Sequence, residues 1–110
     1  IYEAAIHLAK LNKRKNPDAA VEYFKKVMSI AKDLNEAYFT MNANIEYGDF
    51  CVDRKEFLKA LKSYIRAISK TRDKSLEEYK TKIEQRIKEL KVRLGEDEFK
   101  KLEKEIYNNG

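Results

Sequence analysis

The chain has 110 residues, of which 43% are hydrophobic and 39% charged, and its net charge is +5. This length suits one domain, and three glycines with one proline give little punctuation for a many-stranded sheet. No apolar run approaches the roughly 20 residues that span a bilayer, and no signal-peptide pattern opens the chain, so we expect no membrane span. The lone Cys51 excludes an internal disulfide, with which a cytoplasmic location is consistent. Because the chain begins at Ile1 rather than at a methionine, we expect a fragment of a longer protein.

The net positive charge is not concentrated in one long block of sequence. Residues 1–35 carry about +3, chiefly through Lys13, Arg14 and Lys15, and each remaining third carries about +1. A nucleic-acid site would need a longer patch with interleaved aromatic residues. We therefore expect no nucleic-acid partner.

Residues 1–13 have the apolar spacing of an amphipathic helix, which ends in a run of cations. Asn16 and Pro17 then favour a new helix start, with Asn16 as the N-cap and Pro17 in the first turn. A second helix is expected over 17–33. Its buried face should consist of Ala20, Val21, Phe24, Val27, Met28 and Ala31.

A third helix is expected after Asn35, which is a suitable N-cap. The end of this helix is ambiguous, because Gly48 and Asp49 resemble a stop while the next three residues are apolar and would continue the stripe. The apolar residues that define its face are Ala37, Tyr38, Met41 and Ile45.

The fourth helix, expected over 57–70, has the clearest pattern in the chain. Asp53 followed by Glu56 has the spacing of a capping box just before it. Its apolar face alternates small with large side chains, which predicts close packing against helices on both sides. These positions are Phe57, Ala60, Leu61, Tyr64, Ile65, Ala67 and Ile68.

Two further helices are expected over about 75–94 and 96–107. Ser75 and Glu78 have the spacing of a second capping box, and Gly95 should end the longer helix. The apolar stripe between residues 76 and 94 is narrow, as in a helix that covers one side of a stack. No stretch alternates with a period of two residues, so we predict an all-α fold.

The second and fourth helices repeat one pattern at an interval of 40 residues. Ala20 and Phe24 in the first copy correspond to Ala60 and Tyr64 in the second. This Ala-x3-aromatic pattern resembles the second helix of the tetratricopeptide repeat (TPR) family. The resemblance implies antiparallel helix pairs stacked as a right-handed superhelix. The implied parts are repeats over about 1–34 and 35–71, with capping helices over about 75–94 and 96–107.

The first-helix signature of the family is matched less closely. Asn42 stands where the family prefers glycine, and the interval of 40 exceeds the family's 34, so about six extra residues are expected around 50–55. Gly48, Asp49 and Phe50 resemble the turn between the two helices of a repeat. A three-helix bundle over 36–94, similar to the microtubule-interacting-and-transport domain, is the competing fold.

Few residues could carry chemistry. His7 is the only histidine and Cys51 the only cysteine, so a transition-metal site lacks ligands. Glu46, Asp49 and Asp53 lack the ligand order of an EF-hand loop. No glycine-rich phosphate loop and no nucleophile with a matching base are found. We predict a protein that is not an enzyme and that holds no metal and no cofactor.

The resemblance implies that the first helices of successive repeats line a concave groove for an extended peptide or a partner helix. The family's clamp for acidic C-terminal peptides uses Lys and Asn, whereas Ala5, Ala9, Phe39 and Ala43 occupy the matching places here, so that function is disfavoured. The candidate partner-binding residues are Tyr2, Asn12, Glu36, Phe39, Ala43, Glu46, Tyr79 and Lys80.

The leading functional prediction is therefore a protein-protein interaction module. One alternative is a sensor or regulatory domain of a larger bacterial-type transcription regulator or signalling protein. Another is a self-association module, forming a homodimer through the exposed ends of the stack or through the stripe at 76–94.

Overall fold

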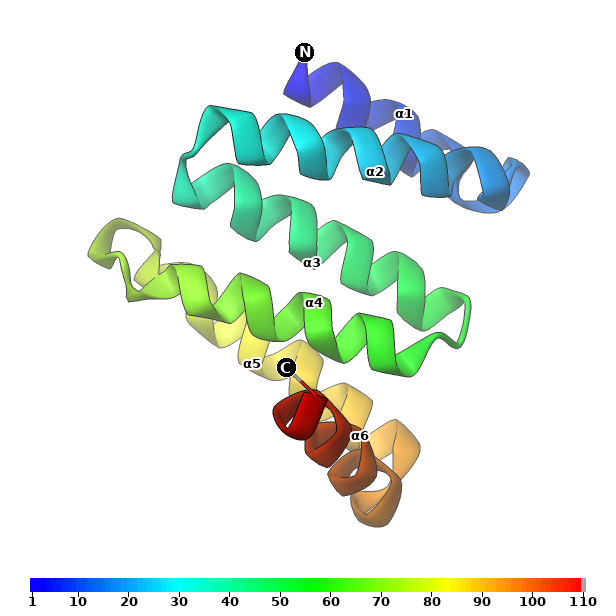
Figure 1. Ribbon diagram of the computed structural model, residues 1–110, viewed down its shortest axis with the longest axis vertical. Coiled ribbons are helices and arrows are strands. Elements are labelled where there is room, and N and C mark those ends of the chain that lie inside the picture. Colours follow the sequence, from blue (N-terminus) through cyan, green and yellow to red (C-terminus); the bar gives the residue numbers. More distant parts are fainter. Residues whose placement is uncertain (110) are drawn as a thin grey trace.

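A computed structural model describes residues 1–109 of the chain, and these residues form helices and short turns without any strand (Figure 1). The all-α prediction is confirmed. The helices are α1 (Tyr2–Lys15), α2 (Pro17–Leu34), α3 (Ala37–Asp53), α4 (Phe57–Ser69), α5 (Glu77–Leu94) and α6 (Glu96–Asn109). Two short 3-10 helices, η1 (Lys70–Arg72) and η2 (Lys74–Leu76), connect α4 to α5.

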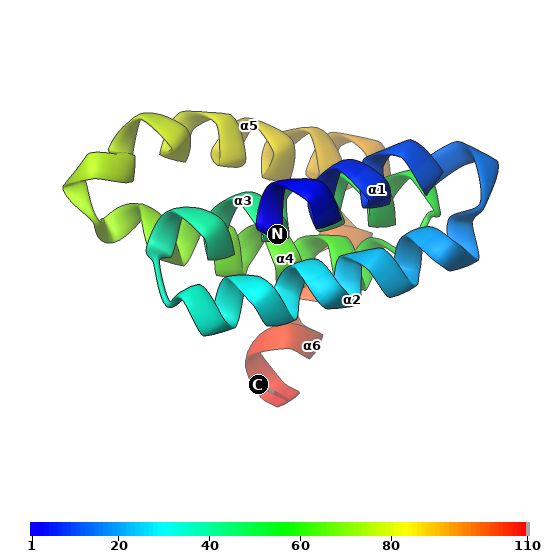
Figure 2. The ribbon, with the colours of Figure 1, turned by 90° about the horizontal axis from the view of Figure 1, so that it is seen from above.

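The helices stack in chain order as antiparallel neighbours. The pairs α1 with α2 and α3 with α4 pack most extensively, while α2 also lies on α3 and α4 on α5 (Figure 1). Seen from above, α1 and α5 lie on one side of the stack and α2 on the other, with α3 and α4 between (Figure 2). Since α2 packs directly on α3, residues 36–94 do not form a separate bundle.

The core between the two helix pairs is aromatic. Phe24 of α2 is 1% exposed, and its ring centroid lies 5.1 Å from that of Phe50 and 5.6 Å from that of Tyr47, both on α3. Ala9 and Ala20 belong to the same buried cluster and let α1 and α2 approach closely. Of the predicted buried face of α2, Ala20, Phe24, Val27 and Ala31 are buried, and Val21 and Met28 are half-buried.

Gly48 lies inside α3 and not at its end. A Cβ atom at this position would lie 2.6 Å from Cε1 of Tyr64 on α4, so the two helices can approach this closely only at a glycine. The predicted turn at 48–50 is therefore wrong, and α3 continues to Asp53.

Three predicted helix caps are wrong, although the cap at Asn16 is confirmed by its bond from the amide of Ala19 (3.2 Å). Asn35 is the C-cap of α2, in the left-handed conformation with φ 52°, which asparagine tolerates better than most residues. Asp53 is the last residue of α3, and α4 follows Glu56 without a side-chain cap. Ser75 does not cap α5, because its amide (3.0 Å) and hydroxyl (2.7 Å) donate to Asp73.

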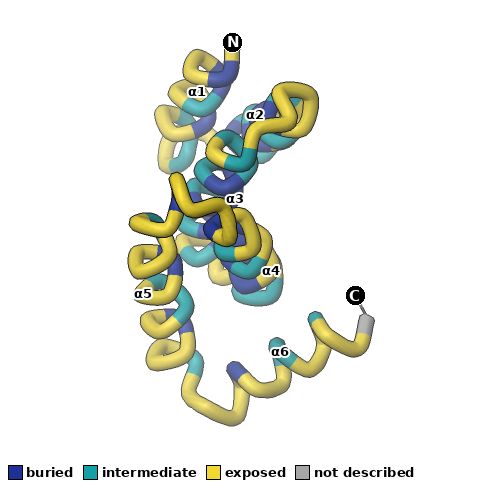
Figure 3. Tube along the Cα trace, turned by 90° about the vertical axis from the view of Figure 1, so that its left-hand side faces the viewer, coloured by how far each residue is buried: buried dark blue, intermediate teal, exposed yellow. Residues whose placement is uncertain are grey.

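The C-terminal helix α6 turns away from the stack and crosses toward α4 (Figure 3). Phe99 is buried and Leu102 and Ile106 are half-buried against the core formed by α3, α4 and α5. No helix within residues 1–109 combines the length and hydropathy needed to cross a membrane.

Candidate functional site

An aromatic row crosses α1, α3 and α5, three helices that are not consecutive in the chain. We define this row as Tyr2, Phe39, Tyr38 and Tyr79. The ring centroids of Tyr2 and Phe39 are 4.8 Å apart, those of Phe39 and Tyr38 5.6 Å, and those of Tyr38 and Tyr79 6.0 Å. All three contacts are edge-to-face, the arrangement that the charge distribution of aromatic rings favours.

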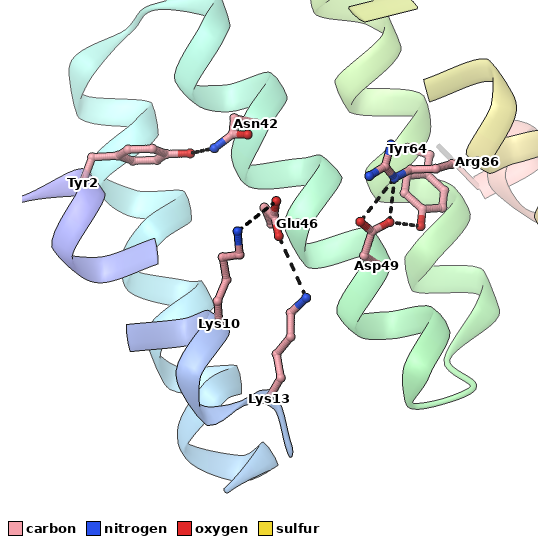
Figure 4. Close-up of polar contacts among 8 residues, drawn as sticks. All are labelled: Tyr2, Lys10, Lys13, Asn42, Glu46, Asp49, Tyr64 and Arg86. Carbon is pink, nitrogen blue, oxygen red and sulfur yellow. Dashed lines mark hydrogen bonds and ion pairs between the residues drawn. The ribbon is translucent and has the colours of Figure 1, made fainter. Parts of the chain in front are cut away.

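Tyr2, at one end of the aromatic row, is buried and hydrogen-bonded, whereas the inner member Tyr38 is exposed. The hydroxyl of Tyr2 donates to the carbonyl of Phe39 (3.3 Å) and accepts from the side-chain amide of Asn42 (2.9 Å; Figure 4). Tyr2 is 6% exposed, and burial raises its pKa to about 12. Tyr38, in contrast, is 40% exposed. A ligand could therefore contact Tyr38, while Tyr2 and Asn42 hold α1 against α3.

Farther along α3, Glu46 faces α1. Its carboxylate lies 3.6 Å from Nζ of Lys10 and 3.9 Å from Nζ of Lys13 (Figure 4). Glu46 is largely covered, whereas Lys10 is half exposed. These contacts bind α1 to α3 on the same side of the stack as the aromatic row.

Next along α3, Asp49 connects three helices. It accepts a 2.5 Å hydrogen bond from the hydroxyl of Tyr64 on α4, and Nε of Arg86 on α5 lies 2.9 and 3.2 Å from its two oxygens (Figure 4). Burial, followed by the bond to Asp49, raises the pKa of Tyr64 far above its ordinary value. The bond to Asp49 raises the pKa of Arg86. The group fixes α5 on the stack through its contacts with α3 and α4.

A cleft of about 890 Å³ opens beside this group, between α3 and α5. Its lining carries both signs of charge, with Asp49, Asp53 and Glu89 facing Lys82, Arg86 and Arg93. A second, more apolar cavity of about 560 Å³ lies between the start of the chain and the end of α2, next to Tyr2 and Phe39. The end of the aromatic row at Tyr2 thus borders a hollow that α2 helps to line.

The structure brings together several of the predicted partner-binding residues. Tyr2, Phe39 and Tyr79 all belong to the aromatic row, and Glu46 lies on the same face. Glu36 and Lys80 are exposed, and Asn12 is half-buried with its amide donating to the carbonyl of Leu8 (2.8 Å).

Four predicted groove positions are buried. Ala43 and Ala9 are 0% exposed, Tyr2 is 6% and Ala5 is 8% exposed, so none of them can contact a partner. Ala43 packs with Tyr2 and Ala5 in a cluster that includes residues of α2, because α1 sits directly over this part of α3.

The sequence prediction also missed residues of this face. Tyr38 was assigned to the buried side of its helix and Asp49 to a turn, while Arg86 was not singled out. Because Asp49 was predicted to lie in a turn, its position on the helix face toward α5 was not recognised. Helical spacing from Glu46 to Asp49 and Asp53 was the available signal that all three share one face.

Within the described residues, no three His, Cys, Asp or Glu side chains are grouped so that they could hold a metal ion. Comparisons of the chain with protein-family models, with curated proteins and with solved structures found no match. Function must therefore be argued from the geometry of this face.

We expect the fold to lose stability at alkaline pH. Burial raises the pKa of Tyr2 and Tyr47 to about 12 and that of Cys51 from 9.0 to about 11, and Tyr64 is raised further. Each group binds its proton more tightly when folded, so its contribution is complete below the unfolded pKa and is lost as the pH rises through the folded value. Each can contribute a slope of up to about 1.4 kcal/mol per pH unit.

Urea unfolding followed by circular dichroism between pH 8 and 11.5 measures this effect. Stability should begin to fall at about pH 8, where unfolded cysteine starts to ionise, and should fall more steeply above about pH 9, where at least half of it is ionised. The Tyr47→Phe variant should show a shallower fall above pH 10. An unchanged unfolding midpoint from pH 8 to 11.5 would contradict the prediction.

Proposed function

We propose that this chain is a non-enzymatic protein-interaction module that binds an extended peptide or a partner helix across the face formed by α1, α3 and α5. The aromatic row carries this proposal, because it joins three helices and includes the exposed ring of Tyr38. Large, rigid aromatic side chains give much contact area for little loss of conformational freedom, which is why tyrosine is enriched at binding hot spots.

A TPR-like repeat arrangement is part of the proposal. Antiparallel helix pairs that stack in chain order support it. So does Gly48, because placing the family's glycine at Gly48 instead of Asn42 moves the register by six residues. That shift moves the six extra residues from within the second repeat to the segment before it, while the interval between the second helices stays at 40.

The chemistry of the face supports binding and not catalysis. A general base or nucleophile works best with a pKa near the operating pH. Burial raises the pKa of Tyr2 and of Tyr64 farther from neutral pH. The carboxylates of Glu46 and Asp49 form ion pairs, with Lys10 and Arg86 respectively. These groups are suited to holding helices together. The predicted cytoplasmic location and the sensor or regulatory alternative stay predictions.

Peptide-library selection followed by affinity measurement tests the proposal. Peptides selected on the wild-type chain should bind at least about 10-fold more weakly to the Tyr38→Ser variant, the loss expected at a binding hot spot. Tyr107→Ser is the matched control, since Tyr107 is 69% exposed but lies on α6, outside the proposed face. Failure to select any peptide, or equal binding by Tyr38→Ser and wild type, would argue against this function.

Self-association is a second candidate, favoured by the outer face of α1. Ile1, Leu8 and Leu11 are 96%, 39% and 55% exposed and share one side of this helix. The other predicted surface, the stripe at 76–94, is less open to a second copy, because Leu76, Ile83 and Leu90 are buried and Tyr79, Ile87 and Leu94 are half-buried. Light scattering of the Leu8→Ser, Leu11→Ser double variant beside the wild type distinguishes a dimer through α1 from a monomer.

A further inference from the structure

The net charge of the chain is concentrated in and just after α4. Residues 57–72 contain five Lys or Arg and no Asp or Glu, so they carry +5, equal to the net charge of all 110 residues. The neighbouring segment, residues 36–53, contains four acidic residues and no basic one. Dividing the sequence into thirds averages these two segments together and hides the contrast.

The helix arranges these cations in a line, which we call the α4 basic row. Its members are spaced three or four residues apart, so they share one side of the helix over about 16 Å. All are exposed, and they lie opposite the buried residues Ala60 and Tyr64, which face the core. The row consists of Lys59, Lys62 and Arg66 of α4 and Lys70, the first residue of η1.

The α4 basic row is not compensated within the described part of the chain. Only Lys59 has an ion-pair partner there, Glu56 at 3.3 Å. In α6, by contrast, acidic and basic residues alternate, and pairs such as Lys101 with Glu98 form within the helix. Like charges three or four residues apart destabilise a helix slightly, so an uncompensated row is best explained by an anion outside the chain.

We propose that the α4 basic row binds the phosphate backbone of double-stranded nucleic acid, without preference for base sequence. The row reaches beyond the peptide-binding function proposed above and does not depend on it, because it uses a different helix. The expectation of no nucleic-acid partner considered the short run Lys13–Lys15, whereas the row becomes continuous only when α4 is formed.

Several polyanions could bind a row of cations, and the lack of exposed apolar and aromatic side chains beside this row favours a nucleic-acid duplex over single strands and membranes. No large hydrophobic residue between 54 and 72 is exposed, whereas single strands stack their bases on aromatic rings and interfacial helices insert apolar ones. An acidic protein would gain only about 0–1 kcal/mol from each exposed ion pair. A duplex releases condensed counterions when cations approach, so charge alone gives it affinity.

Fluorescence anisotropy with a labelled 24-base-pair duplex of random sequence tests the proposal at 50 and 200 mM NaCl. The test variant is Lys62→Gln, Arg66→Gln, Lys70→Gln, in which no replaced side chain has an ion-pair partner among the described residues. The control is Lys15→Gln, Lys88→Gln, Lys104→Gln, which changes the net charge equally at exposed sites on other helices.

The wild type should bind with a micromolar dissociation constant at 50 mM NaCl. The row variant should bind at least about 10-fold more weakly, and its slope of log K against log salt should be smaller by about 2.7, which corresponds to three lost phosphate contacts. The control should stay within about twofold of the wild type. Matching circular dichroism and melting curves would show that both variants are folded.

Three results would overturn the proposal. The first is no binding of the duplex by the wild type at 50 mM NaCl. The second is an equal loss in the row variant and the control, which would show a dependence on net charge alone. The third is tighter binding to vesicles containing 30% phosphatidylserine, or to poly-glutamate, than to the duplex, which would assign the row to a membrane or to an acidic protein.

Discussion

Replacing Phe24 with alanine should destabilise the chain by about 3–5 kcal/mol, the range for removing a fully buried phenylalanine. The side chain is 1% exposed and its ring packs on Phe50 and Tyr47, so it joins the α1–α2 pair to α3. The total free energy of unfolding of a natural domain is about 5–15 kcal/mol, so the variant should be close to unfolding at 37 °C.

Thermal and urea unfolding followed by circular dichroism measure this loss. Phe24→Leu, which keeps most of the volume, should cost less than about 1.5 kcal/mol. Lys25→Ala, next in sequence but exposed, should stay within about 0.5 kcal/mol of wild type. If Phe24→Ala cost less than 1 kcal/mol, the two helix pairs would not depend on this contact.

Local sequence patterns predicted the helices well because burial follows helical periodicity. The start of α2 at Pro17 and the buried positions Phe24 and Tyr64 follow directly from spacing and capping preferences. The end of α3 could not be predicted in this way. Gly48 reads locally as a stop, and only the ring of Tyr64, 16 residues later, explains why a glycine lies within the helix.

The candidate site was less predictable than the fold, because its contacts join residues far apart in the sequence. Tyr2 contacts Phe39, and Asp49 contacts Arg86, each across 37 residues. No local pattern specifies such pairs, since they depend on how α1 and α5 are placed against α3. The α4 basic row is different, since its spacing was visible in the sequence and only averaging of charge over long segments concealed it.

Asp49→Ala should cost about 2 kcal/mol, the second-largest loss that we expect, because it removes a shared acceptor. The hydroxyl of Tyr64, which is 2% exposed, and the guanidinium of Arg86 would both lose their partner. The side chains of Asp49 and Arg86 are 30% and 33% exposed, so water should keep the loss below that of a fully buried ion pair. Asp49→Asn, which keeps an acceptor for Tyr64, should cost less.

Asp53→Ala is the matched control, since Asp53 lies one turn farther along α3 and is exposed. It should stay within about 0.5 kcal/mol of wild type. A double-mutant cycle of Asp49→Ala with Arg86→Met should give a coupling energy of at least about 1 kcal/mol. Coupling near zero, or equal losses in Asp49→Ala and Asp53→Ala, would contradict the prediction.

Amide hydrogen exchange of the Asp49→Ala variant measures whether the loss of stability is localised to α5, which forms one wall of the cleft. Because Asp49 holds α5 through Arg86, its loss should speed amide exchange in α5 more than in α2, since the hydrogen bonds of Asp49 go to α4 and α5. The cleft between α3 and α5 would then have a variable width. Peptides that contact only the aromatic row should still bind Asp49→Ala, whereas peptides that also enter the cleft should bind it more weakly.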